Sequence, residues 1–262
     1  MKAMILASGL GMRLRPLTDD RPKALVTVAG RTLLEIALAR LRAFGVREVI
    51  VNAHHYAEMI VEYLKANDNF GMRIELSREE ELLDTGGGLK KAAHFFSGSL
   101  EPFILHNVDV ISTIDLGRML RVHTEQKALA TLAVQERESS RQLLFDEQGQ
   151  LCGRRTGSDR EMHVPRSQNR DLHPTDLGHP AEQVQALAFC GIHVLSPQIF
   201  AKINEEGAFP IIDTYMRLAA QGEKIIAFHA DECYWRDLGR PESIAQAEAD
   251  LESGSFPELN RS

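Results

Sequence analysis

The sequence predicts an α/β fold: a Rossmann-like, mixed and mainly parallel sheet with helices on both faces. Short apolar segments of strand length alternate with longer segments whose apolar residues recur at helical spacing. The strand-length segments are apolar throughout, as expected of strands that helices cover on both sides. Glycines and polar residues follow several of these segments, at the position where open α/β sheets bind ligands.

The elements can be placed in order along the chain. Residues 2–7 are expected to form a strand that enters a long loop rich in glycine and proline. Leucines and alanines at helical spacing predict a helix over 32–44, which Gly45 ends. The triplet Gly86-Gly87-Gly88 is expected to open a helix that reaches Phe96. Further strands are expected at 48–53, 72–76, 102–105, 129–135, 184–195, 224–228 and 233–235, a hairpin at 143–153, and helices at 56–64, 115–124, 211–221 and 241–251.

Composition excludes several classes of protein. The 262 residues are 44% hydrophobic and 26% charged, which is typical of a globular protein, and 30 Lys and Arg against 37 Asp and Glu give a net charge of −7. That balance argues against nucleic acid as a partner, which requires excess positive charge. No stretch approaches the ~18 apolar residues of a membrane span. The three cysteines are widely spaced, which fits a cytoplasmic location better than a disulfide framework.

The loop after the first strand combines glycines with two cations. Gly9 and Gly11 would let backbone N–H groups approach an anion closely. Arg13, with its fork of donors, and Lys23, a point charge, would suit a triphosphate. A dinucleotide fingerprint is excluded because Leu14 stands where its third glycine belongs, and the spacing of a P-loop is absent. A turn with two solvated cations is the alternative.

Two aspartates follow expected strands, 128 residues apart in the sequence. Asp109 lies just beyond the strand at 102–105, and Asp237 just beyond the strand at 233–235. If the two carboxylates converge there, they would hold Mg²⁺, which prefers few carboxylates together with phosphate oxygens and water. Taken singly, each could equally be a helix cap or a loop residue. Asn52, at the end of the second strand, could bind a ligand or make a structural hydrogen bond.

Six motifs in this order resemble those of the sugar-1-phosphate nucleotidyltransferases, and within them the bacterial N-acetylmuramate-1-phosphate uridylyltransferases and mannose-1-phosphate guanylyltransferase-like proteins. The resemblance extends from Met1 to about Leu251. The motifs are L-A-S-G-L-G-M-R-L-R-P-L-T with P-K-A-L after it, V-N-A-H, D-T-G-G-G, N-V-D-V, F-C-G-I and W-R-D-L-G-R-P.

The resemblance implies the nucleotide-diphospho-sugar transferase fold, which is GT-A-like, and transfer of a nucleoside monophosphate from an NTP to a sugar 1-phosphate. It implies one domain, 1–251, with a nucleotide-binding half (1–125), a sugar-binding half (126–251) carrying a surface insertion at 154–183, and a tail at 252–262. Mg²⁺ is the implied cofactor. The implied residues are Leu6, Ala7, Gly9, Gly11, Arg13, Asn52, Gly86, Gly87 and Asn107 for the nucleotide, Lys23, Asp109, Gly191 and Asp237 for the sugar phosphate, and Asp109 and Asp237 for the metal, with Arg13, Lys23, Asp109 and Asp237 catalytic.

The chain departs from the family pattern at two places. Val108 stands where relatives have glycine, and the V-E-K-P motif, whose lysine contacts the sugar phosphate in relatives, is absent. We expect Arg137 or Arg141 to supply the missing cation. In addition, the glycine triplet has two interpretations: a helix start, or a backbone against which a nucleobase lies flat, which the resemblance favours.

The function predicted is that of a uridylyltransferase acting on an N-acetylmuramate-type amino-sugar 1-phosphate with UTP. The alternative within the family is a GTP-dependent mannose- or heptose-1-phosphate guanylyltransferase, and outside it a nucleotide-sugar sensor without turnover. A dinucleotide-dependent oxidoreductase is excluded because Asn52 stands where such proteins have an acidic residue. A monomer or a homodimer is expected.

Overall fold

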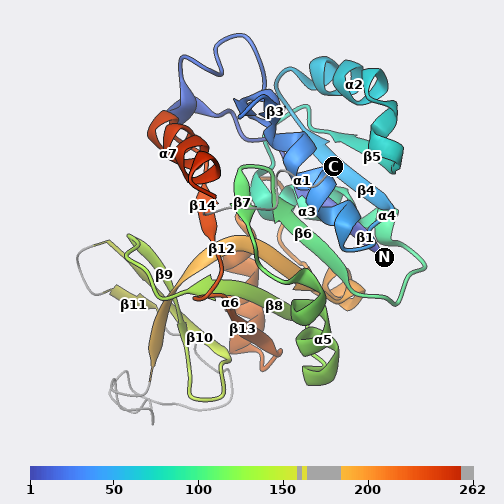
Figure 1. Ribbon diagram of the computed structural model, residues 1–262. Helices are drawn as coiled ribbons and strands as arrows, with labels where there is room; N and C mark the ends of the chain where they lie inside the picture. Colours follow the sequence, from blue (N-terminus) through green and yellow to red (C-terminus); the bar gives the residue numbers. More distant parts are fainter. Residues whose placement is uncertain (158–160, 164–183, 255–262) are drawn as a thin grey trace.

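The computed structural model describes residues 1–157, 161–163 and 184–254, and its main feature is a ten-stranded mixed sheet (Figure 1). The strand order is β11-β10-β9-β12-β6-β1-β4-β5, and β8 pairs with both β12 and β13. Strands β6, β1, β4 and β5 are parallel to one another, as are β8 and β13, and the other pairs are antiparallel. The strands are β1 (Lys2–Leu6), β4 (Glu48–Ala53), β5 (Arg73–Arg78), β6 (Phe103–Asn107), β8 (Ala130–Gln135), β9 (Arg141–Phe145), β10 (Leu151–Thr156), β11 (Glu161–His163), β12 (Gln185–Leu195) and β13 (Ile225–His229).

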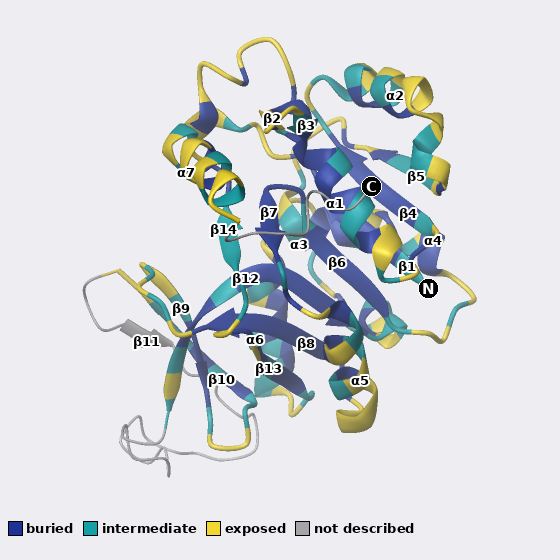
Figure 2. Cartoon of the chain, in the orientation of Figure 1, coloured by how far each residue is buried: buried dark blue, intermediate teal, exposed yellow. Residues whose placement is uncertain are grey.

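Helices cover both faces of this sheet, as predicted. In β1, Ala3 and Ile5 point into one apolar core, whereas Met4 and Leu6 point into a second. Helices α1, α2 and α7 contribute to the first core, and α3, α4 and α6 to the second. Figure 2 shows the central strands buried between these layers. The helices are α1 (Leu33–Ala43), α2 (Ala57–Ala66), α3 (Asp84–Lys91), α4 (Ala93–Phe96), α5 (Leu116–Gln126), α6 (Ile211–Ala220) and α7 (Pro241–Glu252), with 3₁₀ turns at Met12–Leu14, Lys23–Leu25, Asp68–Gly71 and Pro197–Lys202.

The register of the parallel strands aligns their carboxyl ends. Leu6, the last residue of β1, pairs with Asn52 of β4 on one side and with Asn107 of β6 on the other. The polar residues that the sequence places after separate strands therefore lie in one row at one edge of the sheet. This edge positions the candidate site.

Several elements differ from the sequence-based expectation. The helix expected to open at Gly86 begins at Asp84 and gives way at Ala92 to the short helix α4. Part of the segment expected to be irregular from residue 154 is regular, because β10 continues to Thr156 and residues 161–163 form β11. Residues 158–160 and 164–183 of that segment, and 255–262 of the tail, lie outside the described residues. The ribbon of β2 (Thr27–Val28) with β3 (Arg31–Thr32) was not predicted. The strand expected at 233–235 is β14 (Trp235–Asp237), which therefore includes Asp237, and its pairing with β7 (Val110–Ser112) was not predicted.

Within the described part of the chain, the helices are all too short or too polar to span a bilayer.

Three buried histidines bear on stability at acidic pH. His123 bonds to the hydroxyls of Thr131 and Ser196 through its two ring nitrogens, both at 2.9 Å. Burial lowers the pKa of His123 and of His106 to about 4, and that of His193 to about 3. Because an exposed histidine titrates near 6.5, the unfolded chain binds protons between pH 6.5 and 4 that the folded protein does not.

We expect the free energy of unfolding to fall as the pH drops from 6.5 towards 4, and His123→Gln to make this fall shallower. One fewer buried histidine removes about 1 kcal/mol per pH unit from the slope near pH 5. Urea unfolding of both proteins at half-unit steps from pH 5 to 7 measures the slopes, and a comparison at pH 8 isolates the cost of the lost hydrogen bonds. Equal slopes would show that His123 binds its proton over the same pH range in the folded and unfolded protein, so that burial does not lower its pKa.

Candidate active site

An ion pair joins the long N-terminal loop to the end of β6. Lys23 Nζ lies 2.5 Å from Asp109 Oδ2, and the two side chains are only 16% and 7% exposed. Lys23 lies in the 3₁₀ turn that begins directly after Pro22, and Asp109 lies in the turn between β6 and β7. Two of the residues predicted to be catalytic are therefore in contact although 86 positions separate them.

The β7–β14 ribbon brings the second aspartate to the same place. Asp237 pairs with Val110, the residue after Asp109, and the backbone N–H of Leu238 donates to the carbonyl of Asp109 at 2.8 Å. Asp237 Oδ1 accepts from the N–H of Gly239 at 2.7 Å, which fixes the carboxylate. The backbone segments that carry the two aspartates are therefore paired with each other.

Arg13 and the glycine loop lie beside Asp237 and Lys23. A Cβ on Gly239 would lie 2.9 Å from Arg13 Nη2 and 2.7 Å from Asp237 Oδ1, so the guanidinium and the carboxylate flank this glycine. Gly11 has a φ of 65° and is packed against Lys23 and Thr18, whose hydroxyl donates to the Gly11 carbonyl. The loop thus carries both cations to the aspartates.

Asn52 is a fully buried anchor of the strand ends. Its Oδ1 accepts from the backbone N–H of Ala7 at 2.6 Å, and its Nδ2 donates to Ser8 Oγ at 3.1 Å and to Glu79 Oε1 at 2.7 Å. Glu79 is also buried, and its second oxygen accepts from the N–H of Leu83. Of the two interpretations that the sequence left open for Asn52, the structural hydrogen bond is present. Glu79 was missed because it stands within a run of acidic residues that gives no spacing signal.

The glycine triplet in α3 has a packing reason that the sequence did not suggest. A Cβ on Gly86 would lie 2.3 Å from the ring of Phe209, and one on Gly87 would lie 2.4 Å from the carbonyl oxygen of Gly207. Gly86 also donates its N–H to the Phe209 carbonyl at 2.9 Å. The absent side chains therefore admit the segment 207–209 to the start of α3.

A bulge in β12 faces the aspartates. The register of β12 shifts between Phe189 and His193, and Gly191 has a φ of 73° there. A Cβ on Gly191 would lie 2.8 Å from Asn107 Nδ2 and 3.0 Å from Val110, so glycine is required by both space and conformation. Gly191 and Asn107, which the sequence assigns to different substrates, are neighbours.

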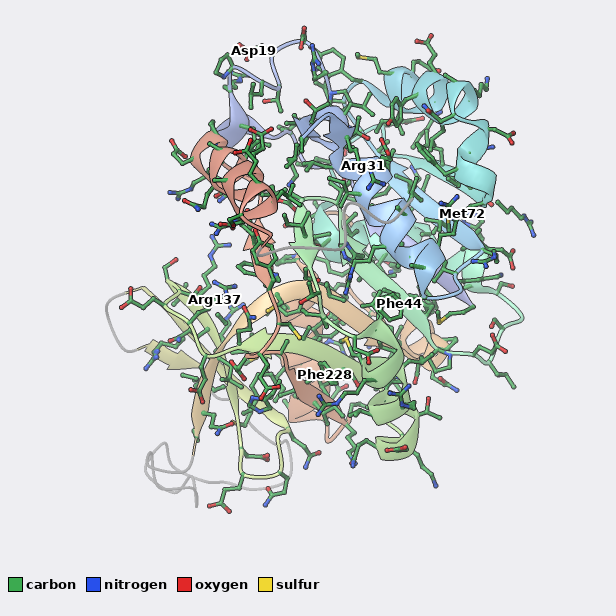
Figure 3. The ribbon with its side chains drawn as sticks, viewed as in Figure 1. Asp19, Arg31, Phe44, Met72, Arg137 and Phe228 are labelled. Atoms are coloured by element: carbon green, nitrogen blue, oxygen red, sulfur yellow. The ribbon has the colours of Figure 1, made fainter. Side chains whose placement is uncertain are left out.

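Of the two arginines expected to replace the missing lysine, Arg137 lies beside the site. Its guanidinium stacks over Trp235 of β14 at 3.8 Å, and its Nη2 donates to the carbonyl of Phe189 at 2.8 Å. Figure 3 shows Arg137 between β14 and β9. Arg141 begins β9, and its backbone bonds to Ser139 on the exposed turn. Trp235, which no spacing rule singles out, joins Arg137 to β12 by donating Nε1–H to the Cys190 carbonyl at 2.7 Å.

The donor set suits a hard divalent cation completed by substrate. Asp109 and Asp237 come from paired segments, and the described residues hold no group of three or more His, Cys, Asp or Glu that would form a complete protein cage. Mg²⁺ is usually bound through one or two carboxylates together with phosphate oxygens and water. The two aspartates fit that ion better than Zn²⁺, which favours His and Cys ligands.

This geometry, a cationic glycine loop opposite two carboxylates at the strand ends, is that of a protein that handles phosphorylated ligands. A model of the nucleotidyl transferase family matches residues 2–143. The chain is 34% identical to the N-acetylmuramate alpha-1-phosphate uridylyltransferase of Caulobacter vibrioides, over 95% of this chain and 96% of that protein. It is 29% identical to a mannose-1-phosphate guanylyltransferase of Mycobacterium tuberculosis, over 97% of this chain and 66% of that protein.

Solved structures agree on the fold. HddC from Yersinia pseudotuberculosis, complexed with GMP-PN, superposes with a TM-score of 0.71 at 20% identity, over 95% of this chain and 99% of that chain. A putative glucose-1-phosphate thymidylyltransferase from Bacillus anthracis gives 0.73 at 18% identity, over 95% and 94%. The chain therefore belongs to the nucleotidyl transferase family and has the nucleotide-diphospho-sugar transferase fold, which confirms the predicted family and fold class.

We expect Gly86→Ala to destabilise the protein by about 1–2 kcal/mol. The new methyl group meets the Phe209 ring and carbonyl, and overpacking of this kind costs about 1–3 kcal/mol, partly offset by the better helix propensity of alanine. Gly9→Ala is the matched control, because a Cβ there meets nothing within 4 Å. Urea unfolding measures both, and a Gly86→Ala variant as stable as the Gly9→Ala variant would contradict the packing explanation.

Proposed function

We propose that this protein transfers UMP from UTP to an N-acetylmuramate-type amino-sugar 1-phosphate and releases pyrophosphate. The observation that carries the proposal is the contact between Lys23 and Asp109. The strand that contains Asp237 pairs with the strand that directly follows Asp109. The identity to the Caulobacter vibrioides uridylyltransferase over nearly both full lengths favours this substrate pair. GTP with a mannose- or heptose-type sugar 1-phosphate is the second candidate, since the relatives include mannose-1-phosphate guanylyltransferases.

The chemistry needs electrostatics rather than a general base. A sugar 1-phosphate is already anionic at neutral pH, so its oxygen can attack the α-phosphorus directly, and the bond from that phosphorus to the departing pyrophosphate breaks. The barrier comes from bringing two anions together and from charge that grows on the phosphates. Cations held in place before the substrates arrive lower that barrier.

Each residue of the site has a proposed role. Lys23 neutralises the reacting phosphates, and Arg13 with the backbone of Gly9 and Gly11 holds the departing pyrophosphate. Nucleotidyltransferases of this family use a divalent metal ion, and we propose Mg²⁺ held by Asp109 and Asp237. When bound, that ion would supply positive charge to the phosphates of both substrates.

The positions around the strand ends complete the proposal. The backbone of Leu6 and Ala7, with Asn107, lines the nucleotide side, and Asn52 acts on it through the Ala7 N–H that it holds. The base is placed near the start of α3, where Gly86 and Gly87 act by admitting the segment 207–209 that packs on them. On the sugar side we propose the N–H of Gly191 and the charge of Arg137, which sits against Trp235, with Arg141 as the more distant cation. In this proposal the half at 1–125 binds the nucleotide and the half at 126–251 binds the sugar.

A screen of pyrophosphate release with four NTPs against a panel of sugar 1-phosphates, in the presence of Mg²⁺, tests the function. We expect the highest kcat/KM with UTP and N-acetylmuramate 1-phosphate. Highest turnover with GTP and a mannose-type acceptor would instead establish the second candidate. Nucleotide-sugar binding without pyrophosphate release from any pair would identify a sensor.

We expect Asp109→Asn and Asp237→Asn each to lower kcat by about 10²- to 10³-fold, the usual effect of removing one preorganised electrostatic group. Asparagine is preferred to alanine at position 109 because Lys23 keeps an oxygen acceptor there, whereas alanine would leave a buried charge unpaired. Asp213→Asn, on the exposed surface of α6, is the control. Near-wild-type kcat in either site variant would contradict the assignment.

A further inference from the structure

Arg155, in the antiparallel part of the sheet, is bonded to a neutral amide and not to an acidic side chain of the described residues. Arg155 of β10 is partly buried, and its Nε donates to Gln142 Oε1 of β9 at 3.1 Å, with Nη2 bonded to the same oxygen. Among the described residues, Arg155 makes no ion pair. Its neighbour Arg154 is paired with Asp213 of α6, on the other face of the strand. A guanidinium oriented by a neutral amide keeps its full charge for a ligand.

Register places Arg155 on the face of the sheet that carries β14. Arg155 pairs with Gln142 across β10 and β9, and Leu187 pairs with Leu143, which sets Gln142 beside Ala188. Ala188 in turn pairs with Gln135, whose amide donates to backbone carbonyls of the segment that leads into β14. Residues in such a row point to one face, and neighbouring strands are about 4.8 Å apart. Arg155 is therefore two strand spacings, about 10 Å, from Ala188 of β12.

Two open hollows lie between Arg155 and Arg137. One, of about 400 Å³, includes Arg137, which stacks on Trp235. The other, of about 530 Å³, is lined by Glu138, Ser139, Ser140, Gln142 and Arg155. The hollows share Glu138 and Gln142, so they adjoin each other between Arg137, which stacks on Trp235, and Arg155.

We propose that Arg155, held by Gln142, binds a carboxylate carried by the sugar of the acceptor, and so selects an acidic amino-sugar 1-phosphate. The inference rests on the proposed function and specifies its acceptor. N-acetylmuramate differs from N-acetylglucosamine by a lactyl ether that ends in a carboxylate, and a guanidinium fork matches that group. Exposed Glu138 repels the carboxylate from the near part of the surface and accepts a hydrogen bond from a sugar hydroxyl or amide N–H.

A substrate–enzyme cycle tests the contact. We expect Arg155→Gln to raise KM for N-acetylmuramate 1-phosphate about 10- to 100-fold with kcat little changed, the usual value of a hydrogen bond to a charged group. When the carboxylate of the substrate is replaced by a carboxamide, we expect the KM of the wild type to rise by the same factor. The KM of Arg155→Gln should be the same for the carboxamide as for the acid. Arg154→Gln is the matched control on the opposite face, with KM unchanged. Arg155→Lys, which keeps the charge, recovers part of the loss.

The outcomes separate this inference from the proposed function. If the wild type turns over N-acetylmuramate 1-phosphate and Arg155→Gln, folded as judged by its urea unfolding midpoint, has the same KM, the inference fails and the function stands. An equal loss for the acid and the carboxamide also overturns it, because the role would then be structural. If the wild type uses only neutral sugar phosphates, the proposed acceptor and the inference both fail.

Discussion

The buried ion pair between Lys23 and Asp109 is the contact on which the site depends. Taking either charge out of water alone would cost several kcal/mol, so the two must stay together once the N-terminal loop has packed. The pair thereby fastens the loop, with Gly11 against Lys23, to the end of β6 before any substrate arrives. An ammonium group has three donors, so its bond to Asp109 leaves others for a phosphate. The same contact thus fixes Lys23 in place before a substrate binds and leaves it donors for the phosphate that we propose it binds.

The buried amide of Asn52 gives this loop its second attachment. It satisfies the N–H of Ala7, where the chain leaves β1, and it is itself held by Glu79. The first residues of the loop are thus fixed by the hydrogen bonds of Asn52 and its end by an ion pair, and the segment between them carries Arg13. The exposed guanidinium can reach an anion while both ends of the loop stay in place.

The sequence predicts best what depends on local pattern. Continuous apolar strands and the residues that follow them locate the edge of the sheet, and with it Asn52, Asn107 and Asp109. The residues that pack beside that edge are positioned by contacts between segments far apart in the sequence. Asp237 is positioned by the pairing of β14 with β7. These two strands are more than a hundred residues apart in the sequence, and each has only three residues. The stacking of Arg137 on Trp235 and the packing of segment 207–209 on Gly86 are likewise long-range contacts: Trp235 and Gly86 lie in recognisable motifs, but the motifs do not show what packs on them.

The long strand β12 explains why the two halves of the site are built differently. It has eleven residues against five in β6, and only its later part pairs with β6, while its earlier part pairs with β9. β12 runs antiparallel to β6 and begins beyond the carboxyl edge of the parallel strands, because its residues before Ile192 extend past the end of β6. The residues proposed to bind the nucleotide therefore come from strand ends, where sequence patterns reveal them. Those proposed to bind the sugar come from strand faces and from the bulge at Gly191, so their partners are fixed only by register.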